Sequence, residues 1–94
     1  MLYHLTTREA WQHAVGLGTF RTESLESDGF IHLSTEDQWP RTHARFFSDA
    51  IDLVLLVIDP ERVTDVRWEA ADGEAFPHLY DALAIDAVVE VREL

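Results

Sequence analysis

The hydrophobic positions near the start of the chain predict a strand followed directly by a helix. Residues 2–5 form a short apolar segment, and Thr6 with Glu9 three positions later is the capping-box pattern of a helix start. Apolar residues then recur with helical spacing up to Val15, and two glycines follow. We therefore expect the first helix to begin at Thr6 and to end by Gly18.

A second unit of the same order follows. Residues 30–33 have the pattern of a strand, and Ser34 or Thr35 opens another capping box with the polar residue three positions later. Apolar and aromatic residues at helical spacing predict a helix over about 36–48. Pro40 falls in its first turn, where the missing amide hydrogen costs little. The polar stretch between the two units, 23–28, is expected to be a loop or a single helical turn.

The second half of the chain is rich in strand patterns. Residues 52–59 are apolar on both faces, as is typical of a strand at the centre of a sheet. Further strands are predicted at 66–69, at 76–80 after a turn at Asp72-Gly73, and at 87–94. Two early helices and several late strands indicate an α+β fold, with both helices packed on a mixed or mainly antiparallel sheet.

Size and composition indicate one domain, residues 1–94, with a single core. The chain has no cysteine, which excludes disulfides and thiolate zinc sites. The longest apolar run, 53–58, is far shorter than the roughly 20 residues of a membrane helix, so no membrane association is expected. The first residues do not resemble a secretion signal, and the expected location is the cytoplasm.

The charge of the chain limits its partners. Eighteen acidic and seven basic residues give a net charge of −11. Such a field repels polyanions, so binding to nucleic acid is not expected. A small anionic ligand in a local pocket remains compatible with this charge, because a few nearby donors outweigh the distant field.

Three histidines are the candidate catalytic residues. His4 and His32 each stand at a strand end, two residues before Thr6 and Ser34, where a helix is expected to start. The free amides of a helix start carry a partial positive charge and bind anions. His78 lies in a third extended segment. If these segments are neighbours, the three imidazoles converge on one cleft.

Five further residues are candidates for ligand binding. Thr6, Ser34 and Thr35 follow the histidines, although helix capping alone explains such hydroxyl residues. Glu69 near a histidine cluster would serve as a general base or bind ribose hydroxyls, the alternative being a solvated edge carboxylate. Tyr80 offers a phenol to a ligand oxygen, or is a half-buried sheet tyrosine.

Four ordered motifs carry a resemblance to a known family. They are Y-H-L-T near the start, G-F-I-H-L-S-T at 29–35, L-V-L-L-V-I-D at 53–59 and F-P-H-L-Y at 76–80. In these the chain resembles a small bacterial family of unknown function that is placed, by fold similarity, in the ADP-ribosyltransferase-like superfamily. The first half is also similar to RNA 2′-phosphotransferases.

The resemblance implies a split, twisted sheet with a cleft for NAD or ADP-ribose. By position, His4 would contact the ribose on the nicotinamide side, and His32 and Ser34 would line the other wall. Three positions depart from the superfamily pattern: Leu5 replaces a glycine, Asp28 stands near an arginine of the phosphotransferases, and Glu69 does not match the catalytic glutamate by position. The resemblance therefore implies a nucleotide-shaped cleft more than a particular reaction.

Three functions follow from these residues. The first is an enzyme or binder acting on a small nucleotide that contains ADP-ribose, with group transfer assisted by the strand-end histidines. The second is a metalloenzyme in which His4, His32 and His78 bind zinc or iron, with Glu69 as ligand or base. The third is a non-enzymatic module that binds a ligand or a protein through a degenerate cleft. Signatures of common hydrolases, P-loop proteins and dinucleotide folds are absent from the sequence.

Overall fold

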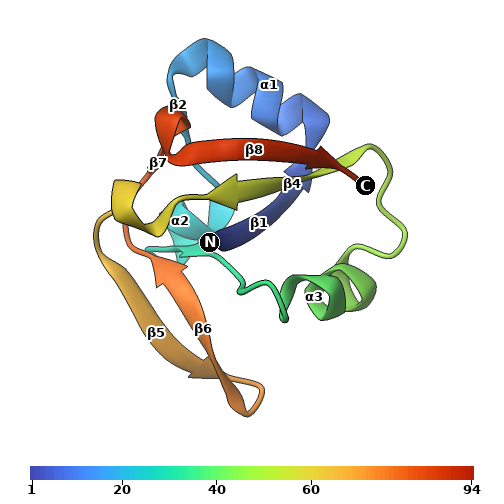
Figure 1. Ribbon diagram of the computed structural model, residues 1–94, viewed down its shortest axis with the longest axis vertical. Coiled ribbons are helices and arrows are strands. Elements are labelled where there is room, and N and C mark those ends of the chain that lie inside the picture. Colours follow the sequence, from blue (N-terminus) through green and yellow to red (C-terminus); the bar gives the residue numbers. More distant parts are fainter.

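The computed structural model describes residues 1–94 and contains three α-helices and eight strands (Figure 1). In chain order the elements are β1 (Leu2–Thr7), α1 (Arg8–Leu17), β2 (Thr19–Phe20), α2 (Glu23–Ser27), β3 (Ile31–His32), α3 (Trp39–Phe46), β4 (Leu53–Ile58), β5 (Val66–Ala71), β6 (Glu74–Leu79), β7 (Leu83–Ala84) and β8 (Val88–Glu93). Two 3₁₀ turns, Pro60–Arg62 and Ile85–Ala87, complete the chain. All strand pairs are antiparallel, which confirms the α+β class and the antiparallel form of the sheet.

Strand β4 lies at the centre of the first sheet, in the order β1-β4-β8. All six of its residues are buried, as the apolar pattern of this segment predicted. Because side chains alternate along a strand, β4 contributes to two apolar clusters, one on each face of the sheet.

The larger cluster, here called the large core, joins β4 to α1, β2, β3 and the C-terminal strands. Its buried members are Leu2, Ala14, Phe20, Ile31, Leu33, Val54, Leu56, Ile58, Leu79, Leu83 and Ala87. The small core on the other face consists of Tyr3, Leu5, Leu55 and Val57. Trp39 and Phe47 at the two ends of α3 cover it. Helices α1 and α3 thus pack on opposite faces of the sheet.

A second sheet, in the order β3-β6-β5, meets the first at a single bridge. The Tyr3 amide donates to the Ser34 carbonyl, and the Ser34 amide donates to the Tyr3 carbonyl, both at 2.8 Å. The sheet is therefore split, and β1 is the strand that touches both halves. In Figure 1 the β5–β6 hairpin projects away from the β1–β4–β8 sheet.

The first helix begins one residue later than the capping pattern predicted. Thr7, and not Thr6, is the N-cap, and its hydroxyl accepts the Ala10 amide at 3.1 Å. The reason is strand pairing: β1 pairs with β4 as far as Thr7 opposite Leu53, so Thr6 belongs to the ladder. Gly18, with φ +85°, ends the helix in the left-handed conformation, as expected.

The second predicted cap is also corrected. Ser34 is occupied by the bridge to Tyr3, and α3 begins only at Trp39, so the helix is shorter than the expected 36–48. Part of the Thr35 capping box does form, because the Gln38 side-chain oxygen accepts the Thr35 amide at 3.0 Å. Pro40 lies in the first turn, as predicted. The segment expected as a loop or a single helical turn is α2, which makes three helices rather than two.

The hairpin between β5 and β6 turns at Asp72-Gly73, as predicted, and both residues have positive φ, +53° and +83°. This is the backbone form of a type I′ turn, which suits the twist of the flanking strands. Both strands are longer than the sequence indicated. Their register places Arg67 opposite His78 and Glu69 opposite Phe76 on one face of the hairpin. None of the helices has the length and apolar character that a membrane-spanning segment requires.

Replacing either central leucine of β4 is expected to destabilise the domain. Leu55→Ala and Leu56→Ala each remove a fully buried side chain from a different core, so each should lower the free energy of unfolding by about 2–5 kcal/mol. Val89→Ala, on the exposed side of β8, is the control and should cost less than about 0.5 kcal/mol. Urea denaturation measures all three. Equal effects of the core and control variants would contradict the two-core arrangement.

Candidate functional site

The structure brings the three candidate histidines into one pocket. The pocket has a volume of about 560 Å³ and lies where β1 meets the β3–β6–β5 sheet, beside α3. Its thirteen lining residues are His4, Leu5, Phe30, His32, Leu33, Ser34, Thr42, Phe46, Phe47, Ala71, Asp72, Phe76 and His78. Seven of them are hydrophobic, and the polar lining residues are the three histidines, Ser34, Thr42 and Asp72.

Strand register explains why the histidines meet. His32 and His78 are directly opposite in the β3–β6 pair, on the same face, with ring centroids 5.3 Å apart. His4 arrives from the other sheet, and its Nδ1–H donates to the His32 carbonyl at 2.6 Å. The bridge next to His4, between Tyr3 and Ser34, holds the two backbones at this distance.

His4 is a neutral imidazole with a fixed tautomer. Burial lowers its pKa from 6.5 to about 4, against the opposing effect of the hydrogen bond to His32. Because Nδ1 carries the hydrogen given to His32, Nε2 holds a free lone pair and has no protein partner. No buried side-chain nitrogen or oxygen lacks a partner, so Nε2 lies on accessible surface. His4 therefore offers an acceptor to a ligand.

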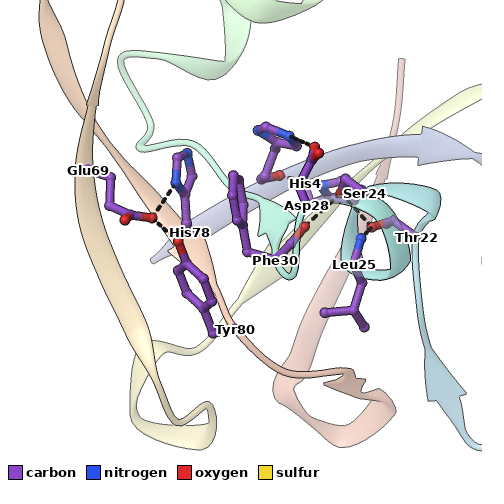
Figure 2. A network of polar contacts seen from close by, with 10 residues as sticks. His4, Thr22, Ser24, Leu25, Asp28, Phe30, Glu69, His78 and Tyr80 are labelled. Carbon is purple, nitrogen blue, oxygen red and sulfur yellow. Dashed lines mark hydrogen bonds and ion pairs between the residues drawn. The ribbon is translucent and has the colours of Figure 1, made fainter.

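His78 is oriented from behind by a carboxylate. Its Nδ1–H donates to Glu69 Oε1 at 2.9 Å, and the Tyr80 hydroxyl donates to the same oxygen at 2.5 Å, as Figure 2 shows. The bonds from Tyr80 and then His78 lower the pKa of Glu69, and the bond to Glu69 raises the pKa of Tyr80. An ionised Glu69 accepts only, so it fixes the proton of His78 on Nδ1 and leaves Nε2 for the pocket.

Phe30 packs the imidazoles together. Its ring stacks on His78 at a centroid distance of 4.1 Å and meets the edge of His32 at 4.8 Å. Tyr80 lies 5.1 Å from the same ring, and Figure 2 shows Phe30 alongside His78 and Tyr80. Phe30 was not predicted as a site residue, although it precedes His32 by two positions and shares its face of the chain.

His32 is the most exposed of the three histidines. Its Nε2 lies 3.8 Å from Asp28 Oδ2. Partial burial and the neighbouring His78 lower its pKa, and Asp28 opposes this shift. His32 therefore supplies both its carbonyl to His4 and an accessible ring at the edge of the pocket.

The other predicted ligand-binding residues divide into three groups. Ser34 is buried and lines the pocket. Glu69 and Tyr80 lie behind His78 and are not part of the lining. Thr6 and Thr35 lie outside it, in the β1 ladder and at the turn before α3.

The expected anion site at two helix starts does not form. The lining includes none of the opening residues of α1 or α3, 8–10 and 39–41, because both helices begin later than predicted. The lining contains no arginine either, and its Asp72 pairs with Arg45 at 3.0 Å. A smaller hollow of about 60 Å³ adjoins the pocket and contains Arg41 and Arg45.

The aromatic wall of the pocket is what sequence reasoning missed. Phe46 and Phe47 come from the end of α3, and Phe76 comes from β6, where it shares a face with His78. Phe46 and Phe47 belong to the aromatic residues at helical spacing from which the helix over 36–48 is predicted, yet Phe46 is 65% exposed. Only the alternation of Phe76 and His78 along a strand was a usable signal.

The three histidines are not arranged as the ligands of a metal ion. No group of three or more histidine, cysteine, aspartate or glutamate residues has an arrangement that holds a metal ion, and this includes the three pocket histidines.

Comparison with known proteins identifies the family. A family model described as "Protein of unknown function (DUF952)" matches residues 5–91. The chain belongs to the DUF952 family. This confirms the small family of unknown function expected from the motifs, whereas the kinship with ADP-ribosyltransferase-like proteins stays a prediction. No curated protein sequence matches the chain.

Solved structures share the DUF952 fold seen here. The crystal structure of protein CC0527 from Caulobacter crescentus is 36% identical and has a TM-score of 0.91, covering 99% of this chain and 84% of that one. The solution NMR structure of CC0527 is similar with a TM-score of 0.85, at 99% and 83% coverage. This chain therefore shares its overall architecture with CC0527.

Burial of His4 predicts a pH dependence of stability. Because its pKa is about 4 in the folded domain and 6.5 for an unburied histidine, the unfolded chain binds the proton first. The free energy of unfolding should therefore fall by up to about 3 kcal/mol between pH 6.5 and pH 4 through this group, and level off below. His4→Asn keeps a donor for the His32 carbonyl but does not titrate. Urea denaturation at several pH values should show a smaller loss in His4→Asn than in the wild type. Parallel profiles would contradict this assignment.

Proposed function

We propose that this pocket binds a nucleotide of the NAD or ADP-ribose class and that its histidines assist a group-transfer reaction. The observation that carries the proposal is the convergence of two oriented imidazoles, His4 and His78, on one aromatic pocket. In both rings Nδ1 is held by a hydrogen bond, so both present Nε2 to a ligand.

Pocket size and lining support a ligand with a planar base. Small-molecule sites have volumes of roughly 300–1,000 Å³, are mostly apolar and carry a few polar groups. The volume of about 560 Å³ and the phenyl rings of Phe30, Phe46 and Phe76 agree with this description. Stacking of a base on such rings gives contact area and orientation.

The two imidazoles are suited to opposite halves of an acid–base reaction. Neutral His4 accepts a proton from an attacking hydroxyl or amine through Nε2. His78 has Glu69 behind it, and this carboxylate stabilises the protonated ring, which then donates from Nε2 to a leaving group. The nucleophile gives its proton to His4 as it forms the new bond. The leaving group takes a proton from His78 as its bond breaks.

We expect the phosphates of such a nucleotide to lie outside the pocket, because its lining contains no arginine and the adjoining hollow contains two. The adjoining hollow shares Thr42, Phe46, Asp72 and Phe76 with the pocket and adds Arg41 and Arg45. Both arginines are already paired, with Glu74 and Asp72, so they supply donors without a large excess of positive charge. We therefore expect modest affinity for the pyrophosphate, with the base providing most of the binding.

Nucleotide binding is tested by thermal unfolding. NAD or ADP-ribose at about ten times its Kd should raise the Tm of the wild type by roughly 5 °C or more. His78→Ala should lose this rise, because it removes both the stacking partner of Phe30 and the Nε2 group. His13→Gln, on the exposed side of α1, is the control and should respond like the wild type. No rise with any such nucleotide at millimolar concentration would overturn the proposal.

Turnover separates an enzyme from a binding module that uses the same pocket. If the histidines act in group transfer, His4→Asn should lower the rate of ligand consumption by about 100-fold, while nucleotide binding persists. Glu69→Gln keeps an acceptor for His78 but removes the charge, and it should lower kcat more than it changes KM. Chromatography of nucleotide incubated with each variant measures the products. Binding without any consumption by the wild type would leave the non-enzymatic function and reject group transfer.

A further inference from the structure

We infer that the pocket selects its ligand by ring charge and binds a planar aromatic cation in preference to a neutral or anionic ring of the same shape. The inference deepens the proposed function and rests on the same pocket, but it concerns the chemistry of the group that enters and not the identity of the whole ligand. Three features of the pocket and its surroundings carry it: the aromatic faces of the lining, the carboxylates behind the lining histidines, and the lone pair of His4.

The aromatic faces favour a cation. Phenyl rings carry negative charge density on their faces and attract cations that lie over them. One protein cation already uses the rim of the pocket in this way, since the Arg45 guanidinium carbon lies 5.0 Å from the centroid of the Phe46 ring. Phe30, Phe47 and Phe76 extend the aromatic surface across the pocket.

The carboxylates around the pocket are not balanced by positive charge. Asp72 lines the pocket and pairs with Arg45. Asp28 and Glu69 lie next to the lining histidines and outside the lining, and neither forms an ion pair with an arginine. The lining contains no lysine or arginine. Two carboxylates therefore leave a local excess of negative charge, and the net charge of −11 over the whole chain adds to it.

His4 presents a lone pair to the pocket rather than a hydrogen. Its Nε2 has no proton in the neutral form fixed by the His32 carbonyl. A ring that carries a carboxylate would face this lone pair, whereas a positively charged ring is attracted to it.

For nucleotides this selectivity has a direct consequence. A pyridinium ring, as in oxidised NAD, fits the pocket better than the uncharged ring of the reduced form. The phosphates of both forms remain near Arg41 and Arg45, outside the acidic part of the lining.

Three probes that share the planar quinoline ring test the inference: 1-methylquinolinium, quinoline and quinoline-2-carboxylate, which are cationic, neutral and anionic near neutral pH. We expect the cation to bind about tenfold more tightly than quinoline at about 0.15 M salt, and the carboxylate to bind most weakly. Isothermal titration calorimetry of the whole chain measures the three constants. Equal affinities, the reverse order, or no binding of any probe would overturn the inference.

A charge-matched pair of variants locates the effect. Asp72→Asn removes the carboxylate in the lining, and asparagine accepts the φ of +53° at this turn position, so the hairpin is expected to fold. The ratio of quinolinium to quinoline affinity should fall at least about threefold in Asp72→Asn. It should stay unchanged in Asp86→Asn, whose carboxylate lies outside the lining and forms no ion pair. Equal effects of the two variants would reject selection by the pocket.

The proposed function and this inference fail separately. If NAD and ADP-ribose do not bind but the quinolinium preference holds, the nucleotide proposal falls and the charge selectivity stands. If the nucleotides bind but ring charge makes no difference among the probes, the charge selectivity falls and nucleotide binding stands.

Discussion

The pair of backbone hydrogen bonds between Tyr3 and Ser34 joins the two three-stranded sheets of this domain, and the position of His4 relative to His32 and His78 depends on it. Tyr3 is held in the small core on one face of β1, so the bridge has a rigid anchor on that side. The neighbouring His4 points to the other face and reaches the His32 carbonyl. Without the bridge, the bond from His4 to the His32 carbonyl would be the remaining hydrogen bond between β1 and β3, and the position of His4 beside His32 and His78 would be less fixed.

His4 and His78 line the same pocket but have different surroundings. Burial disfavours a charge on His4, and its low pKa keeps the ring neutral over the range in which most proteins work. Glu69 has the opposite role, because its ionised form accepts hydrogen bonds from Tyr80 and His78 together. The two histidines therefore differ in the group that holds Nδ1, a backbone carbonyl for His4 and a carboxylate for His78, although they line the same pocket. That difference follows from the position of one carboxylate.

The relation to CC0527 from Caulobacter crescentus concerns architecture. At 36% identity and a TM-score of 0.91 the two chains share the split sheet and the order of elements. A shared fold does not carry a reaction. Function in this DUF952 protein depends on the pocket itself, where the aromatic wall and the oriented imidazoles of His4 and His78 distinguish it more than the motifs in which the histidines stand.

The sequence by itself determined the features that depend on local spacing. The apolar run of β4, the turn at Asp72-Gly73 and the end of α1 at Gly18 follow from side-chain alternation and from backbone conformations that few residues adopt. The His4 and His32 motifs were also visible, but only as a repeated pattern.

The tertiary structure determined the roles of the residues in these motifs. Pairing of β1 with β4 moved the first cap from Thr6 to Thr7, and the bridge to Tyr3 removed Ser34 from capping. The wall formed by Phe46 and Phe76 comes from segments far apart in the chain, and only the packing of α3 against the hairpin side of the molecule brings them together. Register between distant strands is set by the burial of whole faces, and a local pattern contains no information about which distant face it will meet.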